Sequence, residues 1–130
     1  MAKFIKLEDW SWLNIDKIER IFTEMSTWQE GKMAYVESII HAITTGGKIY
    51  KVLDIIAPGI IPDGEQWSFS AELDETANLK LEDIAERLAT IAANPEKTVV
   101  KVPGDMRMDL IVAMNAIVNN TTAEEAEECE

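Results

Sequence analysis

Two runs of β-branched and apolar residues on either side of a glycine pair constrain the fold of this chain more than any other feature. Residues 35–44 and 48–55 both suit extended strands, and Gly46 and Gly47 lie between them. A tight hairpin turn needs positive backbone φ angles, which glycine adopts without steric cost. The sequence therefore predicts an antiparallel β-hairpin over residues 35–55.

The rest of the first half is also rich in strand-forming residues. Residues 4–7 are a short β-prone run that leads into a turn. Residues 15–25 are ambiguous, because their apolar side chains fit helical spacing and also alternate, and their β-branched and aromatic content favours a strand. Residues 57–65, with two prolines and two glycines, predict a loop. The alternation of residues 66–73 predicts a further strand or an extended arm.

The second half changes to helical periodicity. Apolar residues recur every three or four positions over 81–92, which predicts an amphipathic helix that ends at Asn94-Pro95. A short strand over 98–102 follows. Asp105 is then predicted to cap a last helix over 106–118. An antiparallel sheet followed by two helices is an α+β fold, and we expect one such domain over residues 3–120.

The charge of the chain is acidic and partly concentrated in its C-terminal tail. The chain has 24 Asp and Glu against 12 Lys and Arg, a net charge of −12, and five of the acids fall within residues 124–130. Such a run stays solvated, so we expect a disordered tail over 121–130. No basic stripe is present elsewhere. We therefore expect no binding to duplex DNA, which depends on Lys and Arg contacts with phosphates.

Scarcity of cysteine and histidine excludes several classes of site. The chain has one Cys, Cys129, and one His, His41, so an intrachain disulfide and a cysteine-based zinc site are impossible. The phosphate loop, the dinucleotide fingerprint and the nucleophile elbow are all missing. His41 lies in the middle of a predicted strand, where we expect a packed, hydrogen-bonded side chain. We therefore expect a binding protein without metal or cofactor, and not an enzyme.

The N-terminal residues contain no pattern of a targeting segment. Charged residues interrupt residues 1–19, which leaves no apolar stretch for a signal peptide. No window reaches 18 consecutive apolar residues, and the apolar pieces around residue 58 are broken by Pro58 and Pro62. We expect a cytoplasmic protein with no membrane span.

Arginine is so scarce that Arg107 stands out as a candidate ligand contact. Arg107 follows Gly104 and Asp105 at the predicted start of the last helix. Backbone N–H groups at a helix start, together with a guanidinium, form an anion site. The alternative is that Arg107 pairs with a surface acid. Arg87 is the second candidate cation for an anionic ligand.

Aromatic residues supply the other candidate contacts. Trp67 and Phe69 lie on the same side of an alternating segment, where their rings would stack on a nucleotide base, the alternative being packing in the core or at an interface. Tryptophan is enriched at the centres of protein interfaces, and exposed isoleucine pairs are costly. We therefore predict a homo-oligomer, with an interface built from Trp10, Trp12, Ile60 and Ile61.

The N-terminal sequence resembles the opening of many small phage and prophage proteins of Gram-positive bacteria. The resemblance lies in residues 4–9 (FIKLED) and 11–21 (SWLNIDKIERI). With its strand-rich first half, two C-terminal helices and an arginine near the start of the last one, the chain is similar to the Thoeris anti-defence sponge proteins of phages. Those proteins are oligomeric and non-enzymatic, and they sequester cyclic ADP-ribose signals, while some also bind cyclic oligonucleotides.

The resemblance implies phosphate binding by Arg107 and base stacking by Trp67 or Phe69, in the cytoplasm of a host bacterium. The resemblance therefore implies a protein that sequesters a small anionic nucleotide and thereby blocks host antiviral defence. Two other classes stay open. One is an acidic protein-binding inhibitor that mimics nucleic acid, and the other is a structural or interaction module without a ligand.

Overall fold

The predicted hairpin is the centre of the fold. In the computed structural model, which describes residues 3–123, β4 (Met33–Thr44) pairs antiparallel with β5 (Ile49–Ile60). Gly47 lies in the turn between them with a φ of +85°. The ambiguous N-terminal segment forms a short 3-10 turn, η1 (Ile15–Lys17), and then β3 (Ile18–Glu30), which pairs with the other edge of β4. The main sheet therefore has the order β3-β4-β5.

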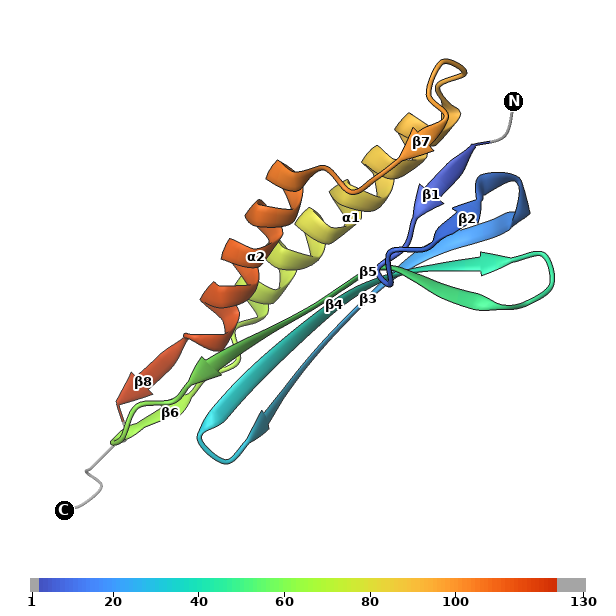
Figure 1. The fold of residues 1–130 in the computed structure, drawn as a ribbon. Helices are drawn as coiled ribbons and strands as arrows, with labels where there is room; N and C mark the ends of the chain where they lie inside the picture. The colour runs from blue at the N-terminus through green and yellow to red at the C-terminus, as the bar shows by residue number, and fades with distance from the viewer. Residues whose placement is uncertain (1–2, 124–130) are drawn as a thin grey trace.

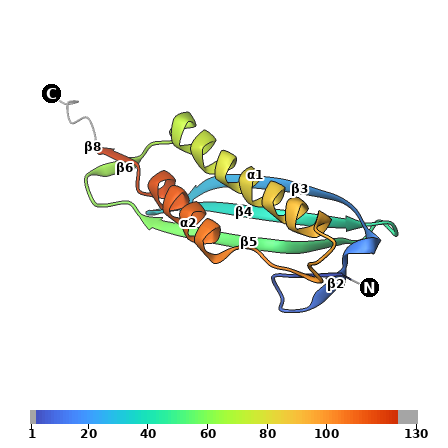
Figure 2. The same cartoon turned by 90° about the horizontal axis from the view of Figure 1, so that it is seen from above.

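Two helices cover one face of this sheet. α1 (Ala71–Ala93) and α2 (Gly104–Val118) lie side by side along the strands (Figures 1 and 2). Alternate residues of β4 are buried beneath the helices, and the Ser38 hydroxyl donates to Met114 Sδ at 3.3 Å. The largest fully buried helical side chains are Leu81, Ile84, Leu88, Leu110, Met114 and Ile117. An antiparallel sheet followed by two helices confirms the predicted α+β fold.

A second, small sheet lies at one end of the molecule. Its central strand, β1 (Phe4–Lys6), pairs antiparallel with β2 (Trp12–Asn14) and parallel with β7 (Val99–Val100). The sequence predicts short strands at both places but not their parallel pairing. That pairing places the segment leading into α2 beside the N-terminal turn.

The loop predicted over 57–65 is wrong for its first residues, because β5 continues through Ile60. Pro58 is tolerated in the ladder because β5 is an edge strand of the main sheet. The next residue is Gly59, and a side chain would not fit there because the end of α2 packs directly on the backbone of β5. A Cβ atom on Gly59 would lie 2.7 Å from the carbonyl oxygen of Val118.

The strand or extended arm predicted over 66–73 is wrong for its last three residues. Only β6 (Glu65–Trp67) is a strand, and α1 begins at Ala71, well before the periodic residues that predict it. The Ser70 hydroxyl accepts a hydrogen bond from the Leu73 backbone N–H at 3.2 Å. This side-chain cap starts a helix where hydrophobic alternation indicates a strand.

Two smaller predictions about the C-terminal part also need correction. Asp105 is not the cap of α2; the cap position is Pro103, and Asp105 lies in the first turn. Thr121–Ala123 forms β8, which pairs with β6, so the tail is not disordered from residue 121. The remaining tail, with Cys129, lies outside the described residues. Neither helix within residues 3–123 is long and apolar enough to span a membrane.

Candidate functional site

The structure separates the predicted ligand residues into two groups. Gly104, Asp105 and Arg107 lie in the first turn of α2, while Trp67 and Phe69 lie in and after β6, beside the opposite end of α2 (Figure 1). The cation and the aromatic pair that the sequence assigns to one ligand are therefore at opposite ends of α2.

Trp67 is held by its own chain. Its indole Nε1 donates to the carbonyl oxygen of Ile117 at 2.9 Å, and the ring packs against the core. Phe69 meets it edge to face, with the ring centroids 6.3 Å apart. These contacts give Trp67 the packing role that the sequence leaves open as an alternative, and only Phe69, which is 51% exposed, presents its ring to solvent.

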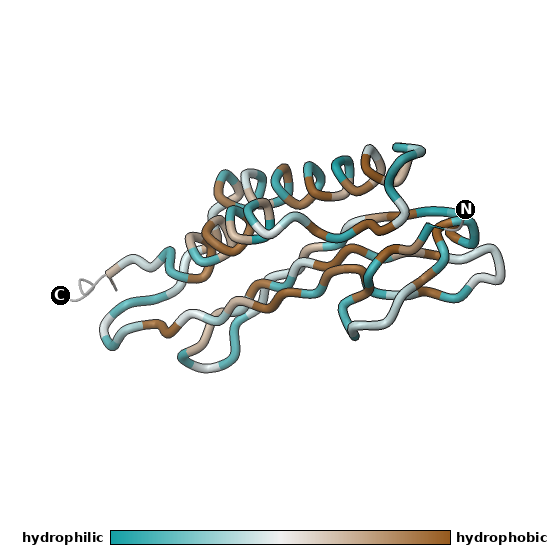
Figure 3. Tube along the Cα trace, turned by 45° about the horizontal axis from the view of Figure 1, so that its top comes forward, coloured by the Kyte–Doolittle hydropathy of each residue, from teal (hydrophilic) through white to brown (hydrophobic). Residues whose placement is uncertain are grey.

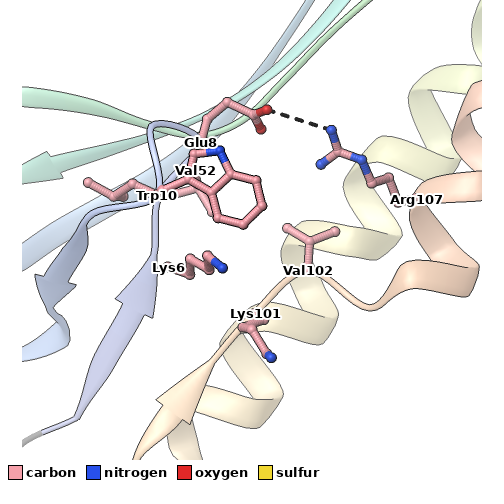
Figure 4. Close-up of a pocket in the computed structure, with 8 residues that line it drawn as sticks. Lys6, Glu8, Trp10, Val52, Lys101, Val102 and Arg107 are labelled. Carbon is pink, nitrogen blue, oxygen red and sulfur yellow. Dashed lines mark ion pairs between the residues drawn. The ribbon is translucent and has the colours of Figure 1, made fainter.

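Arg107 instead lines a surface pocket of about 410 Å³ between the N-terminal turn and the start of α2 (Figure 4). Lys6, Glu8 and Trp10 come from β1 and the turn that follows it, and Lys101 comes from the segment after β7. Val52 and Val102 supply apolar surface. The parallel pairing of β1 with β7 positions these residues together.

Trp10 has an unusual backbone conformation at the edge of this pocket. Its φ is +72°, and it is 76% exposed. The left-handed region costs a side-chain-bearing residue roughly 1–2 kcal/mol. The turn is held by a hydrogen bond from the Leu7 N–H to the Ser11 carbonyl at 2.9 Å and by one from the Ser11 N–H to Asp9 Oδ1 at 3.0 Å. The Ser11 hydroxyl also donates to Asp9, which lowers the pKa of that carboxyl.

A cation lies against this exposed indole. Lys6 Nζ is 4.1 Å from the centroid of the Trp10 ring and 5.7 Å from that of Trp12. Cation–π contacts at exposed sites contribute about 0.5–1 kcal/mol. The pocket therefore presents an aromatic surface with a positive charge directly beside it.

Glu8 is the one acid that lines the pocket, and its position is fixed by neighbouring groups. Its Oε2 lies 3.6 Å from the Arg107 guanidinium, and its Oε1 accepts a hydrogen bond from the Asp54 N–H at 3.1 Å. The pairing of Arg107 with an acid, the alternative that the sequence leaves open, is thus present. Lys6 and Lys101 form no ion pair within residues 3–123. Three cations against one acid leave this pocket positive in a protein of net charge −12.

Arg87 and Gly104 line a neighbouring pocket of about 540 Å³. Lys97 and Lys101 are also in its wall, so Lys101 borders both pockets. Asp105 lines neither of the two. Of the cations predicted for one site, Arg107 and Arg87 therefore belong to adjacent pockets that share the Lys101–Val102 segment.

The residues predicted for a subunit interface are dispersed over the surface. Trp10 belongs to the pocket, and Trp12 is 48% exposed on the small sheet, beside Phe4 and Val99. Ile60 is 72% exposed at the end of β5, whereas Ile61 is 3% exposed and belongs to the core. Only Ile60 of that pair is available to a partner.

Sequence reasoning did not identify Lys6 and Lys101 as site residues. Lys6 is the last residue of β1 and Lys101 directly follows β7, and nothing in either segment indicates that the two strands pair in parallel. The nearest signal was Trp10, which was predicted from the sequence to lie at a subunit interface.

Comparisons of the chain with protein-family models, curated proteins and solved structures found no match. Across residues 3–123, no three His, Cys, Asp or Glu side chains are arranged so that they could hold a metal ion.

Proposed function

We propose that this protein binds a small anionic nucleotide, without turnover, in the pocket between the Trp10 turn and the start of α2. The observation that carries the proposal is the combination of an exposed, conformationally strained tryptophan with three cations. Base–aromatic stacking contributes roughly 1–3 kcal/mol per base. The pocket volume of about 410 Å³ falls in the range of small-molecule sites.

The contacts suggest how the ligand would lie. A base would stack on the Trp10 ring, and Lys6, Lys101 and Arg107 would neutralise phosphate oxygens. Trp10 thus takes the stacking role that the sequence assigns to Trp67 or Phe69. Arg87, which lines the adjoining pocket, would contact a ligand long enough to cross the Lys101–Val102 segment.

The lining of the pocket favours binding over catalysis. Glu8 is its one acid, and that carboxylate is already engaged by Arg107 and by the Asp54 N–H. His41 lies elsewhere, on β4, stacked on Phe22 and hydrogen-bonded to Glu24 at 2.8 Å. The pocket therefore has no free general base for nucleotide hydrolysis.

The resemblance of residues 4–21 to small phage proteins gives the proposal its biological setting. A phage-encoded protein that holds a cyclic nucleotide signal, of the cyclic ADP-ribose or cyclic oligonucleotide type, would block host antiviral defence by sequestration. Stoichiometric binding is sufficient for this role, and no enzymatic step is required.

A thermal-shift panel tests the proposal. A ligand at 100 times its Kd stabilises a protein by about 2.7 kcal/mol, so the correct cyclic nucleotide should raise the melting temperature by several degrees and be recovered unchanged. Inorganic phosphate at the same concentration should have a much smaller effect. A melting temperature that no cyclic nucleotide moves would contradict the proposal and favour a module without a ligand.

One observation favours a second candidate, an acidic inhibitor that mimics nucleic acid. The exposed side of α1 carries a row of carboxylates at helical spacing, Glu72, Glu75, Glu82 and Glu86. Capture of a basic partner by this row should weaken steeply as salt screens the charges. The double variant Glu82→Gln/Glu86→Gln should then lose the partner and keep nucleotide binding.

A further inference from the structure

The face of the main sheet opposite the helices is uncovered by the described part of the chain (Figure 1). The strands contain apolar residues along their length (Figure 3), and the register places both apolar residues and the acids Glu24, Glu37 and Asp54 on the open face. Three isoleucines of β5 on this face are largely exposed: Ile49 by 55%, Ile56 by 54% and Ile60 by 72%. An antiparallel sheet that meets water on one side normally carries polar residues there, so this face has more apolar surface than solvent contact requires.

The strand register shows how residues are arranged on the open face. Directly opposed residues of antiparallel strands point to the same side of the sheet. At one end of the face Glu30, Met33 and Ile60 are neighbours, and at the other end Arg20, Ile43 and Ile49 are neighbours. One end of the face therefore carries an acid with two apolar residues, and the other end carries a base with two apolar residues.

We propose that this face binds the same face of a second copy of the chain, with the strands of the two copies antiparallel and β3 lying over β3. This orientation places Arg20 against Glu30 of the partner subunit and Ile49 against Ile60 of the partner subunit. A two-fold axis repeats both contacts, because each face contains both halves of the pair. The ends of the face are thus complementary to each other in charge and in apolar surface.

The other two-fold arrangement, with parallel strands, is disfavoured by charge. It would lay β3 over β5 of the partner at the same level along the strands. Glu24 and Asp54, which occupy one row on either side of Ile39, would then face each other across the interface. Like charges brought together at an interface cost several kcal/mol. The antiparallel orientation instead places Glu24, Glu37 and Asp54 over Ser26, Ile39 and Ile56 of the partner subunit, so no two carboxylates face each other directly.

The face exceeds the minimum size of a biological interface. Three strands of about twelve residues, at ~3.4 Å per residue and ~4.8 Å between strands, span about 40 by 14 Å. The flat areas of the two faces add up to about 1,100 Å², without the extra surface of protruding side chains. This exceeds the ~1,000 Å² expected of a biological interface. The contact is separate from the proposed nucleotide pocket, which lies between the N-terminal turn and α2.

Sedimentation and light scattering on the full chain test the dimer. We expect a mass of twice 14.6 kDa at micromolar concentration. Arg20→Glu and Glu30→Arg should each weaken the dimer at least tenfold, and the double variant should recover it because the charges are exchanged. Ile60→Glu should give a monomer, whereas Val112→Glu, at a position 65% exposed on α2, should not. Circular dichroism establishes that each variant is folded.

A cysteine pair tests the orientation. In a Cys129→Ser background, an equimolar mixture of Ile49→Cys and Ile60→Cys chains should form a disulfide-linked heterodimer, and neither variant should crosslink efficiently alone. A monomeric mass at all concentrations would overturn the proposal. So would a dimer that keeps its affinity in Ile60→Glu and does not crosslink in the mixture, which would indicate association through another surface, such as the β3 edge.

Discussion

Lys6 Nζ lies 4.1 Å from the centroid of the Trp10 ring, so a positive charge and an exposed aromatic surface are held together at one edge of a surface pocket. Both residues belong to β1 and the turn that follows it, and Trp10 adopts a left-handed backbone there. A bulky residue in that conformation reduces the stability of the turn. This cost is understandable if Trp10 serves binding, since strained residues concentrate at functional sites.

Trp10→Gly should separate stability from binding. Glycine adopts a positive φ without cost, which recovers about 1–2 kcal/mol, and this gain is offset by the lost cation–π contact and the greater freedom of the unfolded chain. The free energy of unfolding should stay within about 1 kcal/mol of the wild type, while nucleotide affinity falls at least tenfold. Urea unfolding and titration calorimetry measure the two quantities. Unchanged affinity would remove Trp10 from the site.

Glu8→Gln should tighten anion binding. The substitution removes the negative charge 3.6 Å from Arg107 but keeps a carbonyl oxygen to accept from the Asp54 N–H. An exposed ion pair contributes about 0.2–1 kcal/mol, so freeing Arg107 should increase affinity about two- to fivefold. Weaker binding in this variant would mean that Glu8 itself contacts the ligand.

Gly59→Ala should destabilise the fold because β5 and the end of α2 approach closely there. The added Cβ would lie 2.7 Å from the Val118 carbonyl oxygen and 2.8 Å from Val118 Cβ. Overpacking of this kind costs typically 1–3 kcal/mol. Gly46→Ala is the matched control, since its Cβ meets nothing within 4 Å. Equal melting temperatures for the two variants would show that the helix does not pack on Gly59.

Glu37→Gln should stabilise the protein at neutral pH but not in acid. The neighbouring Asp54 carboxyl raises the pKa of Glu37 above its usual 4.5. The folded state therefore holds this proton more tightly, and the resulting stability is present below pH 4.5 and lost as pH rises through the raised pKa. At pH 7 the glutamine should gain up to about 1 kcal/mol by removing carboxylate repulsion.

Thermal unfolding at pH 4 and pH 7 checks the Glu37 prediction. The gain should be present at pH 7 and close to zero at pH 4. A gain of equal size at both values would show that it does not arise from the titration of Glu37.

The elements that could be predicted are those whose formation depends on residues close together in the sequence. The hairpin followed from Gly46-Gly47 between two β-branched runs, and the periodic part of α1 followed from residues 81–92. The first ten residues of α1 were missed because residues 71–73 were assigned to the alternating segment and no element was predicted over 74–80. The Ser70 cap was a readable signal for the helix start.

The site could not be predicted because it depends on contacts between distant parts of the chain. Lys6 and Lys101 meet through the pairing of β1 with β7. Trp67, predicted to stack on a ligand, is instead held by a hydrogen bond to the carbonyl oxygen of Ile117, fifty residues away. No local spacing encodes either contact, so Arg107 was identified by its rarity while its neighbours in the pocket were not.

Titration calorimetry with cyclic ADP-ribose and cyclic dinucleotides, on wild-type protein and two lysine variants, tests the central claim most directly. Lys101→Glu reverses a charge in the pocket, whereas Lys32→Glu makes the same change on the exposed β3–β4 turn. We predict stoichiometric binding of one of these ligands to the wild type and to Lys32→Glu, with affinity at least tenfold lower for Lys101→Glu. Equal affinity in both variants, or no heat with any of these ligands, would contradict the account.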